Sequence, residues 1–212
     1  KQLLELNESG VEVLSHTKSH ARLDQLSEED AEEELRGSQQ ALKEIGLNVE
    51  HIVYPYGGHS RLVRKLARKY YRSGYLYNNT TGGINTQPYN TYMLERIALG
   101  AYFDTPTGEY PVTNTFEDYY KKIVDKAVAQ KAWLIITLHP GASSGEFTET
   151  QQSYLVQTIQ YIKSLNVPVL NPSEVLDSMG NVVDIAAYDQ SNSKEVLFQI
   201  GANGRIVGDF TQ

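Results

Sequence analysis

The sequence predicts an α/β protein in which a parallel sheet is covered by helices. Short apolar segments alternate with amphipathic helical segments along most of the chain, which is the pattern of repeated strand and helix units. One of these segments, Trp133–Leu138, is almost continuously apolar, as expected for a strand buried on both faces. Polar candidates for chemistry follow directly after several of the strands. The pattern alone leaves open whether the sheet is open or closed into a barrel.

Composition limits the classes of protein that the chain can represent. Its 212 residues carry a net charge of −7, with 40% hydrophobic and 21% charged residues, as in ordinary globular domains. An acidic chain is a poor partner for nucleic acid, and no apolar run approaches the roughly 20 residues of a membrane span. There is no cysteine, so any metal must be bound by histidines and carboxylates. The absence of cysteine also suits an extracellular protein.

The first part of the chain is expected to form a helix, a strand and a second helix. Lys1–Gly10 has the leucine pattern of the last turns of a helix, with Gly10 as its cap, and Val11–Leu14 is the expected strand. Ser27 is the expected N-cap of the second helix, which should end at Gly46. Its inward stripe is predicted to be Ala31, Leu35, Ser38, Leu42 and Ile45. The acidic run 28–34 is expected to be a solvated face of this helix.

The middle of the chain repeats this alternation. A strand is expected at His51–Tyr54, followed by the turn 55–58, and Ser60 should cap a basic helix that ends at Gly74. Further strands are expected at 75–77 and 93–99, separated by a long loop rich in Gly and Asn, a composition typical of a functional or disordered loop.

The last part is expected to complete the sheet and then to change character. Thr115 and Thr148 should cap helices on either side of the strand 133–138, the second with a capping box to Gln151. A strand at 167–170 and a short helix with Asn171 as cap and Pro172 at its first position should follow. Segments 195–200 and 205–208 flank a Gly-rich turn and predict a β-hairpin. We therefore predict two domains, 1–180 and a β appendage over 181–212.

Three strand ends carry groups that could form one site. His16 and His20 follow the first strand in an H-x3-H spacing that can direct both imidazoles at one zinc ion, although surface histidines show such spacing as often. The turn at Pro55 follows a second strand, and His139 follows a third. Because the carboxyl ends of parallel strands share one edge, these groups are expected to converge. His51 and His59 fit no motif and are interpreted as surface or packing residues.

Three motifs together resemble a known family. SHTKSH, YPYG and TLHPG, in this order and at roughly these distances, resemble the polysaccharide deacetylases, the NodB-homology group or carbohydrate esterase family four. The lead-in ESGVEVLSHTKSHARLDQLSEED is particularly similar, and the stretch from Tyr75 to LERI resembles the poly-N-acetylglucosamine deacetylase branch. The resemblance covers about Lys1 to Leu176 and implies a partial, distorted (β/α) barrel of the NodB type with the β appendage after it.

The resemblance also implies roles for individual residues. His16 and His20 match the two metal-ligating histidines, and the metal would be a divalent ion, zinc in the first place. Tyr56 matches the position whose backbone N–H holds the oxyanion, and His139 matches the general acid that protonates the leaving amine. Pro55, Tyr56 and Leu138 are the candidates for substrate contact. The implied reaction removes N-acetyl groups from a glycan of the peptidoglycan or poly-N-acetylglucosamine type, by a water that the metal activates.

The chain departs from the family pattern in several places. The family's first motif, T-F-D-D-G, supplies the general base and a third metal ligand, and it is absent. We therefore expect the missing strands to precede Lys1 and the fragment itself to be inactive. The Arg expected shortly before Pro-Tyr is absent, with Val53 and Tyr54 near its place, and no D-x-x-D-W motif orients His139. Thr137 stands where many members have the Leu that contacts the acetate methyl, and Arg96 is a candidate ion-pair partner of a carboxylate.

Two other functions fit the same observations. The chain could be a non-catalytic module that binds glycan or forms part of a cell-surface or phage-tail assembly, with the β appendage used for docking or self-association. It could also be a metal-dependent hydrolase of another amide, because a fold does not fix the substrate. Under the leading hypothesis the partner is an N-acetylated polysaccharide, and the protein is extracellular, at the cell surface or in a virion tail.

Overall fold

The computed structural model describes two compact units of the chain. The described residues are 1–77, 83–87, 89–99, 115–138 and 148–179, together with the backbone of 183–189, 194–200 and 206–207. The first unit comprises Lys1–Leu76, Pro88–Leu94 and Leu170–Gln212, and the second comprises Tyr77–Gln87 and Glu95–Val169.

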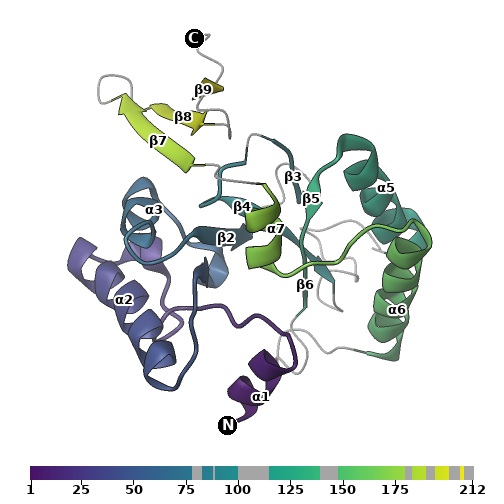
Figure 1. The fold of residues 1–212 in the computed structure, drawn as a ribbon, viewed down its shortest axis with the longest axis horizontal. Helices are drawn as coiled ribbons and strands as arrows, with labels where there is room; N and C mark the ends of the chain where they lie inside the picture. Colours follow the sequence, from purple (N-terminus) through teal and green to yellow (C-terminus); the bar gives the residue numbers. More distant parts are fainter. Residues whose placement is uncertain are drawn as a thin grey trace. The chain divides into compact units, whose positions relative to one another are not determined.

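Both units contain helices and strands, as Figure 1 shows. The helices are α1 (Gln2–Glu8), α2 (Glu28–Glu44), α3 (Arg61–Ala67), α5 (Lys121–Gln130), α6 (Glu149–Ser164) and α7 (Pro172–Ser178). The strands are β1 (His51–Val53), β2 (Ser73–Tyr77), β3 (Ile84–Asn85), β4 (Leu94–Leu99), β5 (Trp133–Leu134), β6 (Ile136–Leu138), β7 (Val183–Asp189), β8 (Lys194–Ile200) and β9 (Ile206–Val207). The predicted α/β class is confirmed, and none of the helices in the described residues is long and apolar enough to cross a membrane.

In the sheet of the first unit, a single residue, Ser15, pairs with β1 on the side away from β2. β1 pairs with β2 in parallel, and Ser15 forms an isolated parallel bridge beside Ile52. The predicted strand Val11–Leu14 is wrong, because the chain around it bonds to the start of α7. The Asn171 amide donates to the carbonyl of Gly10 at 3.0 Å, and the Ser173 N–H donates to Glu12 at 2.9 Å. Only Ser15, immediately before the H-x3-H segment, therefore remains in register with β1.

Helix α2 forms where its sequence predicts, but its predicted inward stripe is buried only in part, since Ile45 follows the end of the helix and is 49% exposed. The Ser27 hydroxyl accepts a hydrogen bond from the backbone N–H of Asp30, and the side chains of Ala31, Leu35 and Ser38 are buried. The helix ends before Gly46, whose φ of +94° is a backbone conformation that glycine adopts readily because it has no Cβ. Helices α2 and α3 pack against one another in the first unit (Figure 1).

Helix α3 is shorter than predicted. Ser60 caps it as expected, accepting from the N–H of Val63, but the helix ends at Ala67 and Gly74 lies inside β2. The glycine is needed there for a close approach instead of a helix end, because a Cβ at Gly74 would lie 2.0 Å from the hydroxyl oxygen of Tyr54. Tyr54 is fully buried in the core of the first unit.

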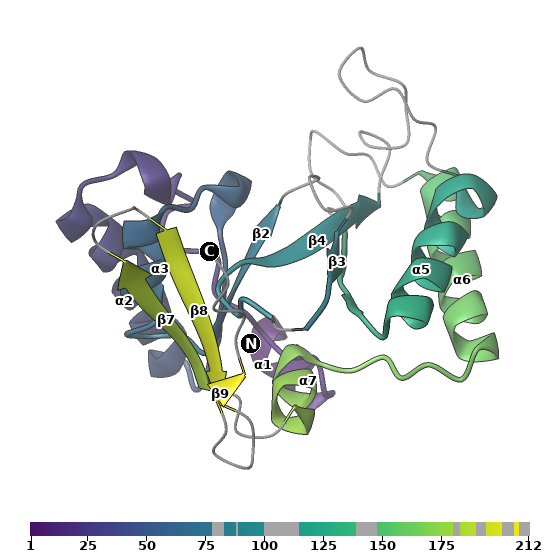
Figure 2. The ribbon, with the colours of Figure 1, turned by 90° about the horizontal axis from the view of Figure 1, so that it is seen from above.

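The second unit has its own core between strands and two helices. β4 pairs with β6 in parallel, Ile97 opposite Ile136, whereas β3 pairs with β5 in the antiparallel sense. The predicted strand 133–138 is thus divided into two short strands with different partners. The predicted caps are confirmed. Thr115 caps the π-helical turn Phe116–Tyr120, which leads into α5, and Thr148 caps α6 with a full capping box. Helices α5 and α6 lie side by side in both ribbon views (Figures 1 and 2).

The chain after residue 166 agrees with the prediction only in part. The expected strand at 167–170 is wrong: these residues form no strand, and the side chains of Val169 and Leu170 are 75% and 44% exposed. Helix α7 begins at Pro172 with Asn171 as its cap, as predicted. The expected hairpin is present as β8 with β9, and β7 adds an unpredicted third strand along β8 (Figure 2). The domain boundary near 181 stays a prediction.

Candidate metal site on the histidine loop

Two histidines of the first unit share one exposed loop. The ring centroids of His16 and His20 lie 4.7 Å apart, with the ring planes at 77°. Thr17 and His20 adopt positive φ angles of 66° and 61°, which residues other than glycine rarely do. Each such residue costs on the order of 1–3 kcal/mol, so contacts elsewhere must hold this loop in shape. The two imidazoles that the sequence singled out therefore lie together.

The backbone fixes the orientation and tautomer of His16. Its Nδ1 lies 2.6 Å from the carbonyl oxygen of Val53 at the end of β1. Since a carbonyl only accepts, Nδ1 carries the proton in the neutral ring and Nε2 carries the lone pair. A metal-binding histidine typically uses its second nitrogen in this way, which sets the ring orientation and raises its basicity.

The predicted oxyanion residue lies beside the second histidine. The ring centroids of Tyr56 and His20 are 4.8 Å apart, and the Tyr56 hydroxyl is 3.2 Å from Nδ1 of His20. Tyr56 has a φ of 55° and its side chain is 66% exposed, whereas Pro55 is buried. The turn after β1 thus presents the tyrosine outward, next to the histidine loop. The preceding segment supports this turn, since Asp24 packs against Gly58.

A carboxylate of α2 binds the middle of the histidine loop. Glu34 Oε2 accepts hydrogen bonds from the backbone N–H groups of Lys18 at 2.9 Å and Ser19 at 2.8 Å. Its Oε1 accepts from the Ser19 hydroxyl at 2.6 Å. Partial burial raises the pKa of Glu34, but these hydrogen bonds outweigh it and hold the pKa below its ordinary value. The carboxylate is therefore ionised at neutral pH.

The loop is anchored at its first residue as well. The Ser15 hydroxyl is buried and lies 2.8 Å from that of Ser38 on α2. The Tyr71 hydroxyl lies within hydrogen-bond distance of both Ser15 Oγ, at 2.9 Å, and the carbonyl of Leu35, at 2.7 Å. A buried polar network of this kind holds Ser15 in place where the loop begins.

The donor set fits two of the ligands of a zinc ion. With Zn–N distances near 2.0–2.1 Å and tetrahedral angles, two imidazole centroids should lie about 5 Å apart, close to the observed separation of His16 and His20. Zinc sites in enzymes usually have three protein ligands. Among the residues that the structure describes, no group of three or more His, Cys, Asp or Glu side chains could hold a metal ion.

The other predicted site residues belong to the second unit. Leu138, the last residue of β6, is partly buried and packs against the core of that unit. The Arg96 guanidinium donates to the Thr137 hydroxyl at 3.2 Å, and its burial lowers the pKa to about 10. His139 lies outside the described residues, so the predicted convergence of the strand ends stays a prediction.

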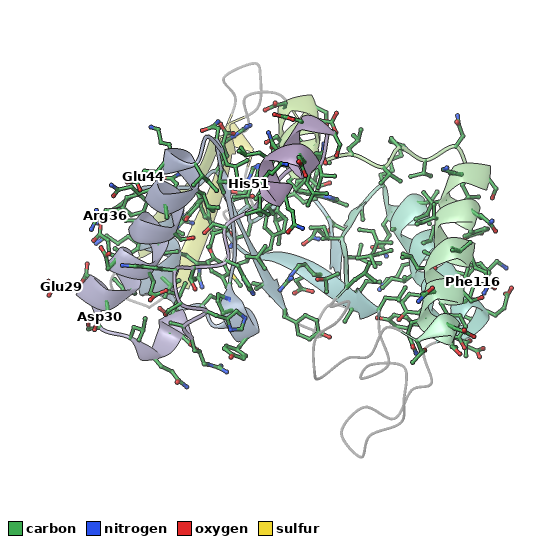
Figure 3. All side chains as sticks on the ribbon, turned by 90° about the horizontal axis from the view of Figure 1, so that it is seen from below. Glu29, Asp30, Arg36, Glu44, His51 and Phe116 are labelled. Atoms are coloured by element: carbon green, nitrogen blue, oxygen red, sulfur yellow. The ribbon has the colours of Figure 1, made fainter. Side chains whose placement is uncertain are left out.

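Sequence reasoning missed the residues that shape the loop. Glu34 belongs to the acidic run that is predicted to be a solvated face, and its hydrogen bonds do lie on the exposed side of the helix. Glu33 in the same run is 43% exposed beside Lys18, so the prediction holds for the run and misses only the contact of Glu34 with the loop backbone. Figure 3 shows that Glu29, Asp30, Arg36 and Glu44 do lie along the outer side of α2, while His51 lies among packed side chains. Nothing in the sequence distinguishes Glu34 from the other acidic residues of this run.

Comparison with known proteins finds a family match over the first part of the chain. Residues 1–73 match the family model described as polysaccharide deacetylase. The predicted resemblance is therefore confirmed over the residues that carry the histidine loop and the Pro-Tyr turn. No curated protein matches the chain.

Solved structures show the fold. The Xyl-CE4 domain of a multidomain xylanase from the hindgut metagenome of Trinervitermes trinervoides is 15% identical, with a TM-score of 0.56, over 91% of this chain and 78% of that one. A mutant of BA3943, described as a CE4 family pseudoenzyme, is 13% identical, with a TM-score of 0.53, over 82% of this chain and 50% of that one. The chain has the fold of part of this (β/α) barrel, as predicted.

A streptococcal enzyme gives a higher identity over a shorter match. The Streptococcus pyogenes deacetylase PplD, solved in complex with acetate, is 28% identical over 45% of this chain, with a TM-score of 0.42. The match spans 42% of the PplD chain, less than half of its length.

Proposed function

We propose that this chain is part of a metal-dependent deacetylase that removes N-acetyl groups from a glycan of the peptidoglycan or poly-N-acetylglucosamine type. One observation carries the proposal: the His16 and His20 rings lie close to the separation expected for two ligands of one zinc ion, beside Tyr56 of the Pro-Tyr turn. A substrate of this kind would place the protein outside the cell or at its surface.

The chain's own residues would divide the work as follows. His16 and His20 would hold a divalent ion, zinc in the first place, which would supply Lewis acidity for amide hydrolysis when bound. The backbone N–H of Tyr56 would donate to the developing oxyanion, and Pro55 would shape the adjoining wall. His139 would protonate the leaving amine, and Leu138 would contact the substrate. The hydrogen bond from His16 to Val53 would keep its ligating nitrogen aimed at the ion.

A non-catalytic glycan-binding module is the second candidate. It is favoured by one observation: no third metal-ligating side chain joins the two histidines in the described part of the chain. A module of this kind would bind glycan without releasing acetate, with or without metal.

Metal titration tests the proposal directly. Co²⁺ replaces Zn²⁺ in many sites and reports its coordination by visible absorption, so residues 1–212 would be titrated with Co²⁺ and then with competing Zn²⁺. We expect one equivalent to bind, and binding to be lost in His16→Ala and in His20→Ala. The same substitution at His59, which bonds to the carbonyl of Gly57 in its own turn, is the matched control and should leave binding unchanged. Equal binding by the wild type and both loop variants would remove the histidines from the site.

Acetate separates the two candidate functions. Acetate, the product of the proposed reaction, should change the absorption of bound Co²⁺ in the wild-type chain. Residues 1–212 contain no T-F-D-D-G motif, so we expect no acetate release from N-acetyl-chitooligosaccharide by this chain alone. Binding of the oligosaccharide that is independent of metal, together with no response to acetate, would favour the glycan-binding module.

A further inference from the structure

We propose that Glu34 is a positioning residue that fixes the Lys18–Ser19 turn and thereby sets the separation of His16 and His20. The inference rests on the proposed function for its effect on metal binding, but the effect on the turn can be measured without metal. Glu34 would touch neither substrate nor metal and would act only through the loop.

The carboxylate contacts the part of the loop that lies between the two histidines. Both of its oxygens are used, one by the N–H groups of Lys18 and Ser19 and the other by the Ser19 hydroxyl. Consecutive backbone N–H groups that point at one carboxylate oxygen define the local path of the chain. Charge-assisted hydrogen bonds of this kind are about twice as strong as those between neutral groups.

The loop needs such a support because its backbone is unfavourable. Thr17 and His20, on either side of the turn, both have positive φ angles. Without the carboxylate, these residues could relax toward ordinary conformations. The imidazoles would then lose their fixed separation, and part of the free energy of metal binding would be needed to restore it.

Helix α2 meets the loop at two further points. Gly37 lies one turn after Glu33, and a Cβ at Gly37 would lie 3.2 Å from Cδ of Lys18. Ser38, also on α2, meets the Ser15 hydroxyl where the loop begins. The loop is therefore held against α2 at both Ser15 and Ser19.

Glu33 provides a matched control one residue away. It lies on the same helix and pairs with the side chains of Lys18 and Arg36, without a hydrogen bond to the loop backbone among those described. Glu33→Gln and Glu34→Gln remove the same charge and keep the same side-chain shape. A difference between these variants therefore reports the backbone contacts of Glu34 and not the charge of the helix.

The first experiment is amide hydrogen exchange of the metal-free chain, read at Lys18 and Ser19. We expect Glu34→Gln to accelerate exchange at both amides by about tenfold or more, and Glu33→Gln to change it by less than twofold. Ser19→Ala, which removes only the hydroxyl bond, should have an intermediate effect. Unchanged exchange in Glu34→Gln would overturn the proposal, whatever the metal results are.

The second experiment is the Co²⁺ titration of the same variants. Loss of a group that supports metal ligands typically weakens metal binding by 10–100-fold, and we expect this for Glu34→Gln but not for Glu33→Gln. If the wild type binds Co²⁺ and Glu34→Gln binds it equally well, the link from the turn to the histidines is overturned. If the wild type binds no Co²⁺, the proposed metal site fails, and the exchange data alone decide the role of Glu34 in the turn.

Discussion

The Tyr56 hydroxyl lies 3.2 Å from Nδ1 of His20, so the Pro-Tyr turn and the histidine loop meet through these two side chains. A hydroxyl can donate or accept. If His20 binds metal through Nε2, its Nδ1 must carry the proton and donate to the tyrosine oxygen. Tyr56 would then orient His20 as the carbonyl of Val53 orients His16.

Tyr56→Phe is therefore expected to weaken metal binding without affecting the fold. The side chain is 66% exposed, so the free energy of unfolding should change by less than about 0.5 kcal/mol. The Co²⁺ affinity should fall by roughly tenfold, the lower end of the range for groups that orient a ligand. Tyr161→Phe, which removes a hydroxyl bonded to Asp125 on the surface, is the control. Equal affinity in Tyr56→Phe would show that the contact does not orient His20.

Tyr71→Phe is expected to destabilise the start of the histidine loop. The hydroxyl is buried next to Ser15 Oγ and the carbonyl of Leu35, and its removal leaves both with one partner fewer. The expected loss is about 1–3 kcal/mol in the free energy of unfolding, measured by urea denaturation. Tyr70→Phe is the neighbouring control, because the Tyr70 hydroxyl bonds to Glu32 near the surface and should matter by less than about 1 kcal/mol. Similar losses in the two variants would contradict this account.

The local signals in the sequence predicted most helices well. Side-chain caps such as Ser27 and Thr148 act on their own first turn, so their effect is visible in a few neighbouring residues. Gly74 shows the limit of such reasoning. A glycine after an amphipathic segment resembles a helix end, but here it is required by the Tyr54 ring, which comes from a distant part of the sequence.

The sequence predicted the main side chains of the candidate site but not the groups that hold them in position. His16, His20 and Tyr56 are recognisable because their residue types and spacing carry the chemistry, and they do lie together. The groups that hold them include the Val53 carbonyl and the Glu34 carboxylate. A backbone carbonyl has no signature in a sequence, and one acidic residue in an acidic run cannot be distinguished without coordinates.

Two glycines of the first unit are expected to respond in opposite ways to alanine. At Gly74 the added methyl would meet the buried Tyr54 ring, so Gly74→Ala should lose about 1–3 kcal/mol or more of unfolding free energy. At Gly37, inside α2, the closest atoms belong to the flexible ends of Glu33 and Lys18, which can move aside. Gly37→Ala should therefore gain up to about 1 kcal/mol from helix propensity. Urea denaturation measures both changes in unfolding free energy. A loss above about 1 kcal/mol for Gly37→Ala would show that the Glu33 and Lys18 side chains cannot move aside.

The buried His51 should make the stability of the protein sensitive to acid. Its Nδ1 bonds to the Ser73 hydroxyl at 2.8 Å and its Nε2 to the Ser173 hydroxyl at 2.9 Å, with Glu12 3.2 Å away. Burial lowers the pKa of His51 below its ordinary value of about 6.5, although the Glu12 carboxylate partly opposes this. Arg72 also lowers this pKa and Glu50 raises it.

The sign of the effect follows from proton binding. Below pH ~6.5 the unfolded chain binds a proton at this histidine that the folded chain does not bind until its lower pKa is reached. The stability contributed by neutral His51 is therefore complete above about pH 6.5 and decreases as the pH falls through this window, by at most ~1.4 kcal/mol per pH unit. Thermal unfolding at pH 7.5 and pH 5.5 measures the difference.

His51→Gln should reduce this acid sensitivity even if it lowers stability at both pH values. The amide can replace some of the hydrogen bonds of the imidazole but cannot titrate. Ser173→Ala is the control, because it removes one hydrogen bond to the ring and leaves the titrating group in place. It should lower the melting temperature while retaining the dependence on pH. If His51→Gln loses as much stability between pH 7.5 and pH 5.5 as the wild type, the acid sensitivity arises from other groups.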